Sequence, residues 1–140
     1  MTTKLMLRIA SGVSALFTIG HSLGGLKHWS PFADNPVLRA MTDTHFPVRG
    51  GSRTYLELYL GLGWTISVLM ALQTVLLWQL ASLARTNPAQ VRAMIVPFAI
   101  AALAIGVIAW RLIDPVPALF SVALLIALLC AWFAERRPAR

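Results

Sequence analysis

Charged residues are scarce in this sequence, and acidic residues are the scarcest of all. Only 12% of the 140 residues are charged, with 12 Lys and Arg against five Asp and Glu. A soluble domain carries roughly a quarter charged residues, and the mean hydropathy here is +0.72. The shortage of charge therefore excludes an ordinary soluble domain and indicates a single integral membrane domain over residues 1–140.

Other absences exclude several kinds of site. The single cysteine, Cys130, lies inside an apolar run, so an intrachain disulfide is impossible. The three histidines have no metal-ligand spacing, and no phosphate loop, nucleophile elbow or paired-cysteine motif occurs. We therefore expect no metal and no cofactor. The net charge of +7 arises from basic residues between apolar runs, which favours membrane lipids rather than nucleic acid as partners.

What the sequence has in abundance is apolar runs. Each of the four is close to the length that a helix needs to cross roughly 30 Å of hydrocarbon, about 20 residues, and a helix satisfies its own backbone in lipid. Short connections make neighbouring helices antiparallel, and no strand-like alternation is sustained. We expect an all-α fold, a four-helix transmembrane bundle with an uncleaved first span. The spans run over about 5–25, 54–84, 93–113 and 117–134.

The first connection, residues 26–53, is long for a loop without structure of its own. Asp34 or Asn35 is a suitable N-cap, and Pro36 suits a first helical turn. The sequence therefore predicts a short helix on the outer membrane surface, with one apolar face formed by Val37, Leu38 and Met41.

The basic residues favour one orientation, because cytoplasmic loops carry an excess of Lys and Arg. With the N-terminus inside, the inner set is Lys4, Arg8, Arg85, Arg92, Arg136, Arg137 and Arg140. The outer set is the smaller one, Lys27, Arg39, Arg49, Arg53 and Arg111. We expect a multi-pass protein of the cell inner membrane with both termini in the cytoplasm.

Three ionisable residues fall near the outer ends of the predicted spans: His21, Glu57 and Arg111. Charges at membrane depth usually face the bundle interior and pair with each other, so we expect these three to converge. On the second span, 3.6-residue spacing places Glu57 on one stripe with small and apolar residues. That stripe contains Gly61, Trp64, Val68 and Ala71.

A functional site at this point would use His21 and Glu57 as an acid–base pair and Arg111 to stabilise an anion or a carbonyl. Its ligand contacts would include Tyr59, Trp64 and Trp110. Each residue also has a structural alternative. Glu57 would be a carboxylate near the lipid headgroups, His21 a packing histidine and Arg111 an arginine whose side chain reaches water. The aromatic residues would belong to the membrane interface.

The segments "GHSLGG", "SRTYLELYLGLGWTISV" and "WRLIDPVPALFS" resemble an uncharacterised family of small bacterial four-span membrane proteins. That family has a Gly-His-Ser/Thr-Leu-Gly motif and an acid-Phe/Tyr-Leu-Gly-x-Gly pattern. Here Glu57 stands where Asp is expected, and Leu56 stands where an aromatic residue is expected. The chain also resembles DoxX-like proteins loosely, in size and topology. The resemblance implies a bacterial inner-membrane location and supplies no activity.

We therefore expect a protein that binds a lipid-like amphiphile in an outer-leaflet pocket. The ligand would be a quinone, an isoprenoid or a sterol-like molecule, and if the protein is an enzyme it would also transform this ligand. The sequence leaves open whether it is an enzyme. One alternative is a non-catalytic structural or accessory membrane subunit. A second alternative is a transporter, which at this length would have to act as a homo-oligomer.

Overall fold

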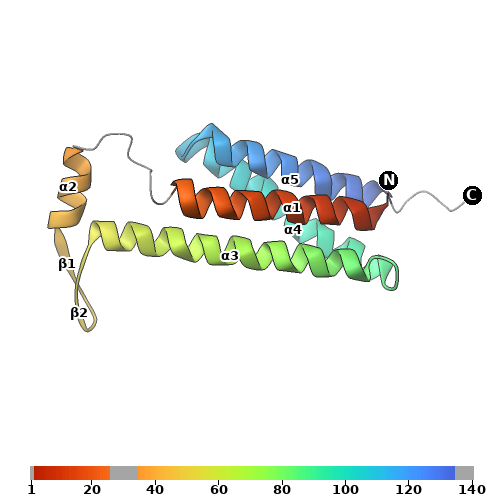
Figure 1. Ribbon diagram of the computed structural model, residues 1–140, viewed down its shortest axis with the longest axis horizontal. Helices are drawn as coiled ribbons and strands as arrows, with labels where there is room; N and C mark the ends of the chain where they lie inside the picture. The colour runs from red at the N-terminus through yellow and green to blue at the C-terminus, as the bar shows by residue number, and fades with distance from the viewer. Residues whose placement is uncertain (1, 26–34, 135–140) are drawn as a thin grey trace, which may run out of the picture. The chain divides into compact units, whose positions relative to one another are not determined.

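The computed structural model describes residues 2–25 and 35–134. Within them the chain is mostly helical, with five α-helices, a short π-helical segment and one antiparallel pair of strands (Figure 1). The elements are α1 (Thr3–Gly20), the π-helix (His21–Gly25), α2 (Pro36–Asp43), β1 (His45–Val48), β2 (Gly51–Thr54), α3 (Tyr55–Leu83), α4 (Pro88–Leu112) and α5 (Pro115–Ala134).

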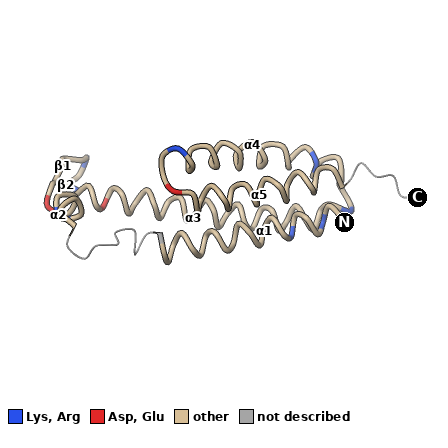
Figure 2. The backbone as a smooth tube through the Cα atoms, turned by 90° about the horizontal axis from the view of Figure 1, so that it is seen from above, with Lys and Arg blue, Asp and Glu red and all other residues tan. Residues whose placement is uncertain are grey.

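Three helices, α3, α4 and α5, are long and apolar enough to cross a membrane. Only 17%, 17% and 33% of their most apolar windows are buried inside the protein, so most of their apolar side chains face outward. A soluble protein rarely exposes apolar surface on this scale. Their few charged residues lie near helix ends, and the middles of these helices carry none (Figure 2). The three helices support a membrane protein.

Helix α1 lies at the position of the predicted first span, but it is less apolar than the other three. It is 18 residues long, contains Lys4 and Arg8, and buries a face that includes Thr3, Ser11 and Ser14. It is not among the helices that meet the length and hydropathy of a membrane span. A four-span bundle therefore remains a prediction.

The chain divides into two compact units. Unit one contains Met1–Phe17 and Met70–Arg140, and unit two contains Thr18–Leu69. One hydrophobic core holds unit one together, and α1, α3, α4 and α5 all contribute side chains to it. Its largest fully buried side chains are Leu7, Leu77, Val91, Ile95 and Leu128.

Hydroxyl groups join α1 to α3 within unit one. Ser11 donates to the carbonyl of Thr74 (2.9 Å), and Ser14 donates to the carbonyl of Met70 (3.4 Å). The hydroxyl of Thr74 (2.9 Å) and the amide of Gln73 (3.3 Å) both donate to Ser14. We call these five residues the hydroxyl seam. Since later residues of α1 meet earlier residues of α3, the two helices are antiparallel here.

Helix α2 of unit two confirms the helix predicted in the first connection. Asn35 caps it, because its side-chain oxygen accepts from the backbone N–H groups of Val37 (2.9 Å) and Leu38 (3.4 Å), and Pro36 occupies the first turn. The apolar face is only partly covered. Leu38 and Met41 are half-buried, whereas Val37 is exposed.

The expectation of an all-α fold is wrong at residues 45–54, where β1 and β2 form a hairpin. Gly50, at the tip, has a φ of +90°, which L side chains rarely adopt. Each strand has four residues, too few for alternation to be recognised in the sequence. The ring of Phe46 lies 5.0 Å from that of Tyr55, which opens α3.

The interior stripe predicted for the second span is also wrong. Trp64 is 46% exposed and Val68 is 68% exposed. The buried residues of α3 lie on a different face and are Gly63, Ser67, Leu77, Leu80 and Ala81. Spacing alone fixes which residues share a face of a helix, but not which face meets a neighbour.

Candidate functional site

Glu57 lies in the first turn of α3, where it caps the helix. Its carboxylate accepts from the backbone N–H of Thr54 (2.8 Å), and the hydroxyl of Thr54 accepts from the backbone N–H of Glu57 (3.1 Å). This reciprocal pair is a capping box, in which two backbone donors that the helix leaves open are satisfied. The sequence signal, Thr-x-x-Glu at 54–57, was present and was missed because Glu57 was interpreted as a buried charge.

His21 opens the π-helical segment after α1, and it lies beside Ser67 of α3, with Nδ1 3.0 Å from Oγ. Ser67 is ten residues beyond Glu57, which is about 15 Å along a helix. The structure therefore does not bring His21 and Glu57 together as an acid–base pair. Arg111 belongs to unit one, whereas His21 and Glu57 belong to unit two.

A small polar cluster surrounds Ser67 in unit two. The hydroxyl of Ser22 lies within donating distance of Ser67 Oγ (3.0 Å) and of the Thr18 carbonyl (2.8 Å). Ser67 is 5% exposed and donates to the Gly63 carbonyl (3.3 Å). π-Helical turns are frequent at functional sites. The cluster supports either a polar link between helices or proton exchange between an imidazole and two hydroxyls.

Helices α4 and α5 approach each other closely at Gly106 of α4. A Cβ atom added there would lie 3.3 Å from Cβ of Ser121 on α5. Small residues at such contacts allow helix backbones to approach closely. Ala102, Gly106, Ala118 and Ser121 form a floor of this kind between the two helices.

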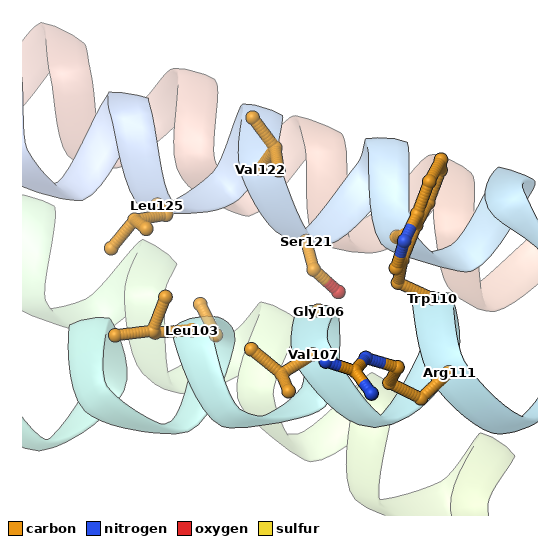
Figure 3. Close-up of a pocket in the computed structure, with 10 residues that line it drawn as sticks. Leu103, Gly106, Val107, Trp110, Arg111, Ser121, Val122 and Leu125 are labelled. Atoms are coloured by element: carbon orange, nitrogen blue, oxygen red, sulfur yellow. The ribbon is translucent and has the colours of Figure 1, made fainter.

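Larger side chains flank these small residues and leave a groove between α4 and α5. Its volume is about 340 Å³, at the lower end of the roughly 300–1,000 Å³ typical of ligand pockets. Figure 3 shows Arg111 running back along α4 toward Val107, with Trp110 on the side of α5. The walls are Leu103, Val107, Trp110, Arg111, Val122 and Leu125.

Arg111 is the one charged residue that lines this groove. The nearest acid in sequence, Asp114, accepts from the backbone N–H of Val116 (2.7 Å) and so caps α5. Over the described residues 2–25 and 35–134, no ion pair or hydrogen bond involves the side chain of Arg111. Its position in the last turn of α4 suits the helix dipole. Among these residues, nothing neutralises the cation that lies beside the apolar groove.

Of the residues predicted to contact a ligand, Trp110 and Arg111 line the groove, whereas Tyr59 and Trp64 lie in unit two. The sequence did not predict the small residues between α4 and α5 or the apolar side chains that line the groove. Their signal was weak, because a Gly among many Ala and Leu residues is common in membrane helices.

Fold and groove together define a helical membrane protein with an apolar groove that ends at a cation. No known protein family, curated protein or solved structure matches the chain. The resemblance to small bacterial four-span proteins stays a prediction.

Proposed function

We propose that the protein binds one lipid-like amphiphile, a quinone, an isoprenoid or a sterol-like molecule, in the groove between α4 and α5. The tail or ring system lies along the apolar walls, and a carbonyl or anionic head contacts Arg111. The observation that carries this proposal is the unpaired guanidinium of Arg111 beside the groove. A guanidinium donates to oxygen atoms in a fixed fork.

The size of the groove limits the ligand. A volume of about 340 Å³ suits one chain or one fused ring system, not a whole two-chain phospholipid. The groove is open along its side, and its walls include Leu103 and Val107, which are 56% and 55% exposed. A ligand can therefore enter laterally from the bilayer without passing through water.

Binding is the role that the geometry supports, and catalysis is not part of the proposal. Glu57 is engaged in capping α3, and His21 lies beside Ser67, so the acid–base pair expected from the sequence has no geometric support. A non-catalytic structural or accessory subunit is the second candidate. The hydroxyl seam favours it, because such bonds hold helices in register with no ligand.

The proposal includes a location. In it α1 is a fourth span, both termini are cytoplasmic, and the Arg111 end of the groove lies in the outer leaflet of a bacterial inner membrane. With Cys130, which is exposed, replaced by Ser, a cysteine at Arg39 should react with an impermeant maleimide in intact cells. A cysteine at Asn87 should not react. The reverse pattern would place the groove mouth in the inner leaflet.

The binding test fills the groove from its wall. Leu103→Trp should lower retention of farnesyl phosphate in native mass spectrometry of the detergent-solubilised protein. Ile100→Trp is the matched control, because Ile100 is an exposed apolar residue of α4 (63%) that does not line the groove. Equal binding by both variants would contradict the proposal.

Arg111→Gln tests the head contact separately. It should weaken binding of farnesyl phosphate by roughly tenfold, since a hydrogen bond to a charged group contributes about 1.5–3 kcal/mol. Binding of farnesol, which lacks the phosphate, should change little. Ubiquinone-1 and cholesteryl hemisuccinate, compared under the same conditions, identify which class of amphiphile the groove prefers. If no class binds, the structural role is the better description.

A further inference from the structure

A group of basic residues lies at the far end of unit one from Arg111. The guanidinium carbon of Arg8 lies 3.1 Å from the centre of the Trp78 ring, and Nη2 of Arg8 donates to Ser82 (3.2 Å). Trp78 and Ser82 are one turn apart on α3, so Arg8 is held against a single face of that helix. Stacking on an indole keeps a guanidinium flat and fixed in place.

Helix spacing and register place two further cations at the same end of unit one. Lys4 is one turn before Arg8 on α1, on the same face. Helices α1 and α3 are antiparallel, and Arg8 of α1 lies beside Ser82 of α3. Lys4, one turn earlier on α1, is therefore level with Arg85, in the turn that follows α3. Figure 2 shows basic positions gathered at the end of the helices where α1 begins. We call Lys4, Arg8 and Arg85, with Trp78 and Ser82, the basic end site.

The positive charges of this site lack a carboxylate among the described residues of unit one. The single acidic residue there is Asp114, which caps α5. It lies beyond the other end of α4, and 25 residues of helix correspond to about 37 Å. Like charges at one place repel each other, so an anion bound there would stabilise the arrangement.

The hydrogen-bonding capacity of Arg8 is also incompletely used. A guanidinium has five N–H donors. Within residues 2–25 and 35–134, one of its hydrogen bonds is made, to Ser82, and the buried Nη1 atom makes none. The ring face of Trp78 covers the cation on one side, and those remaining donors that are not buried favour an acceptor with several oxygen atoms.

We propose that the basic end site binds the phosphodiester headgroup of an anionic phospholipid. A phosphodiester offers oxygen acceptors to Arg8 and charge to Lys4 and Arg85. Trp78, which is 55% exposed, is a residue type that prefers the membrane interface, and the fatty acyl chains lie along the exposed apolar side chains of α3. The site is separate from the groove between α4 and α5 and does not depend on what that groove binds.

The test measures lipid binding by native mass spectrometry of the full chain in detergent. Dioleoylphosphatidylglycerol should bind at least about tenfold more tightly than dioleoylphosphatidylcholine, since each Lys or Arg near an anionic lipid contributes roughly a fivefold gain. Lys4→Gln/Arg85→Gln, which keeps the Arg8–Trp78 stack, should lose most of that preference. Addition of Arg8→Gln should remove the rest. Equal binding of both lipids by the unmodified protein would overturn the proposal.

Arg92→Gln is the control for diffuse attraction. Arg92 stacks on Trp132 at 4.2 Å, and its substitution also removes one charge and one cation–π pair from unit one. The lipid preference should survive it. The single variant Arg85→Gln, measured beside it, should lower the preference; an equal loss from Arg92→Gln would mean a diffuse field rather than a site. Displacement of the lipid by millimolar inorganic phosphate would mean a free-phosphate site, and either outcome overturns the proposal.

Discussion

Two helix contacts in unit one are built by different means. Where α1 meets α3, the hydroxyl seam supplies hydrogen bonds between the helices. Where α4 meets α5, Gly106 and Ser121 supply close approach, and the hydroxyl of Ser121 donates to the Pro117 carbonyl of its own helix (2.9 Å). The first contact is polar and specific in register. The second is apolar and leaves a groove beside it.

The difference separates residues that hold the fold from residues that are available to a ligand. The hydroxyl and amide groups of the hydroxyl seam have hydrogen-bond partners inside the protein, so the seam needs nothing from outside. Among the described residues, the α4–α5 contact leaves Arg111 without a counter-charge. The proposed ligand binding is therefore assigned to the α4–α5 contact, and mutations at the two contacts should affect different properties.

The largest expected effect comes from Gly106→Leu, which forces α4 and α5 apart. Overpacking a close contact costs about 1–3 kcal/mol, and the melting temperature in detergent should fall accordingly. Gly61→Leu is the matched control, because a Cβ atom at Gly61 meets nothing within 4 Å. Equal melting temperatures for the two variants would show that the close approach does not stabilise the contact.

A smaller effect is expected from Ser14→Ala in the hydroxyl seam. Hydrogen bonds between membrane helices average about 0.6 kcal/mol, and Ser14 participates in those with Met70, Gln73 and Thr74. The variant should unfold more easily but still retain the amphiphile. Thr65→Ala, which removes only a bond within α3 to Gly61, should leave stability unchanged. If Ser14→Ala lost the amphiphile but kept its stability, the hydroxyl seam rather than the α4–α5 contact would be the ligand-binding contact.

The smallest effect is expected from Glu57→Gln, which lies outside both contacts. Glutamine can also complete a capping box, so the stability change should stay within about 0.5 kcal/mol. Thr54→Ala should instead increase hydrogen exchange at residues 55–59, because N-cap removal costs about 1 kcal/mol. If the melting temperature of Glu57→Gln were as low as that of Gly106→Leu, the charge of Glu57 would link helices, as expected from the sequence, and would not merely cap α3.

The sequence predicted helices better than it predicted contacts. The predicted span 54–84 agrees with α3 (Tyr55–Leu83) because both ends of the apolar run are polar. For α4 the predicted start at residue 93 was late. The apolar run begins there, but Pro88 already occupies the first turn. Asn35 and Pro36 predicted the start of α2 correctly, since capping is a local property.

The candidate site was less predictable, because it depends on which helix faces meet. Arg111 and Trp110 were chosen for their chemistry and do line the groove, but the groove itself comes from the approach of Gly106 to Ser121, 15 residues apart in sequence. His21 was expected beside Glu57 and lies beside Ser67, which is ten residues further along α3 than Glu57. The depth of two residues can be compared only once the register of their helices is known.

The two-residue connection between α4 and α5 has a consequence for biosynthesis. Ile113 and Asp114 are too few to cross a bilayer, so the end of α4 and the start of α5 emerge on the same side. In a membrane, α4 and α5 would therefore enter as one hairpin unit. Because they are the last two helices of the chain, the groove can form only after α1, α2 and α3 have been synthesised.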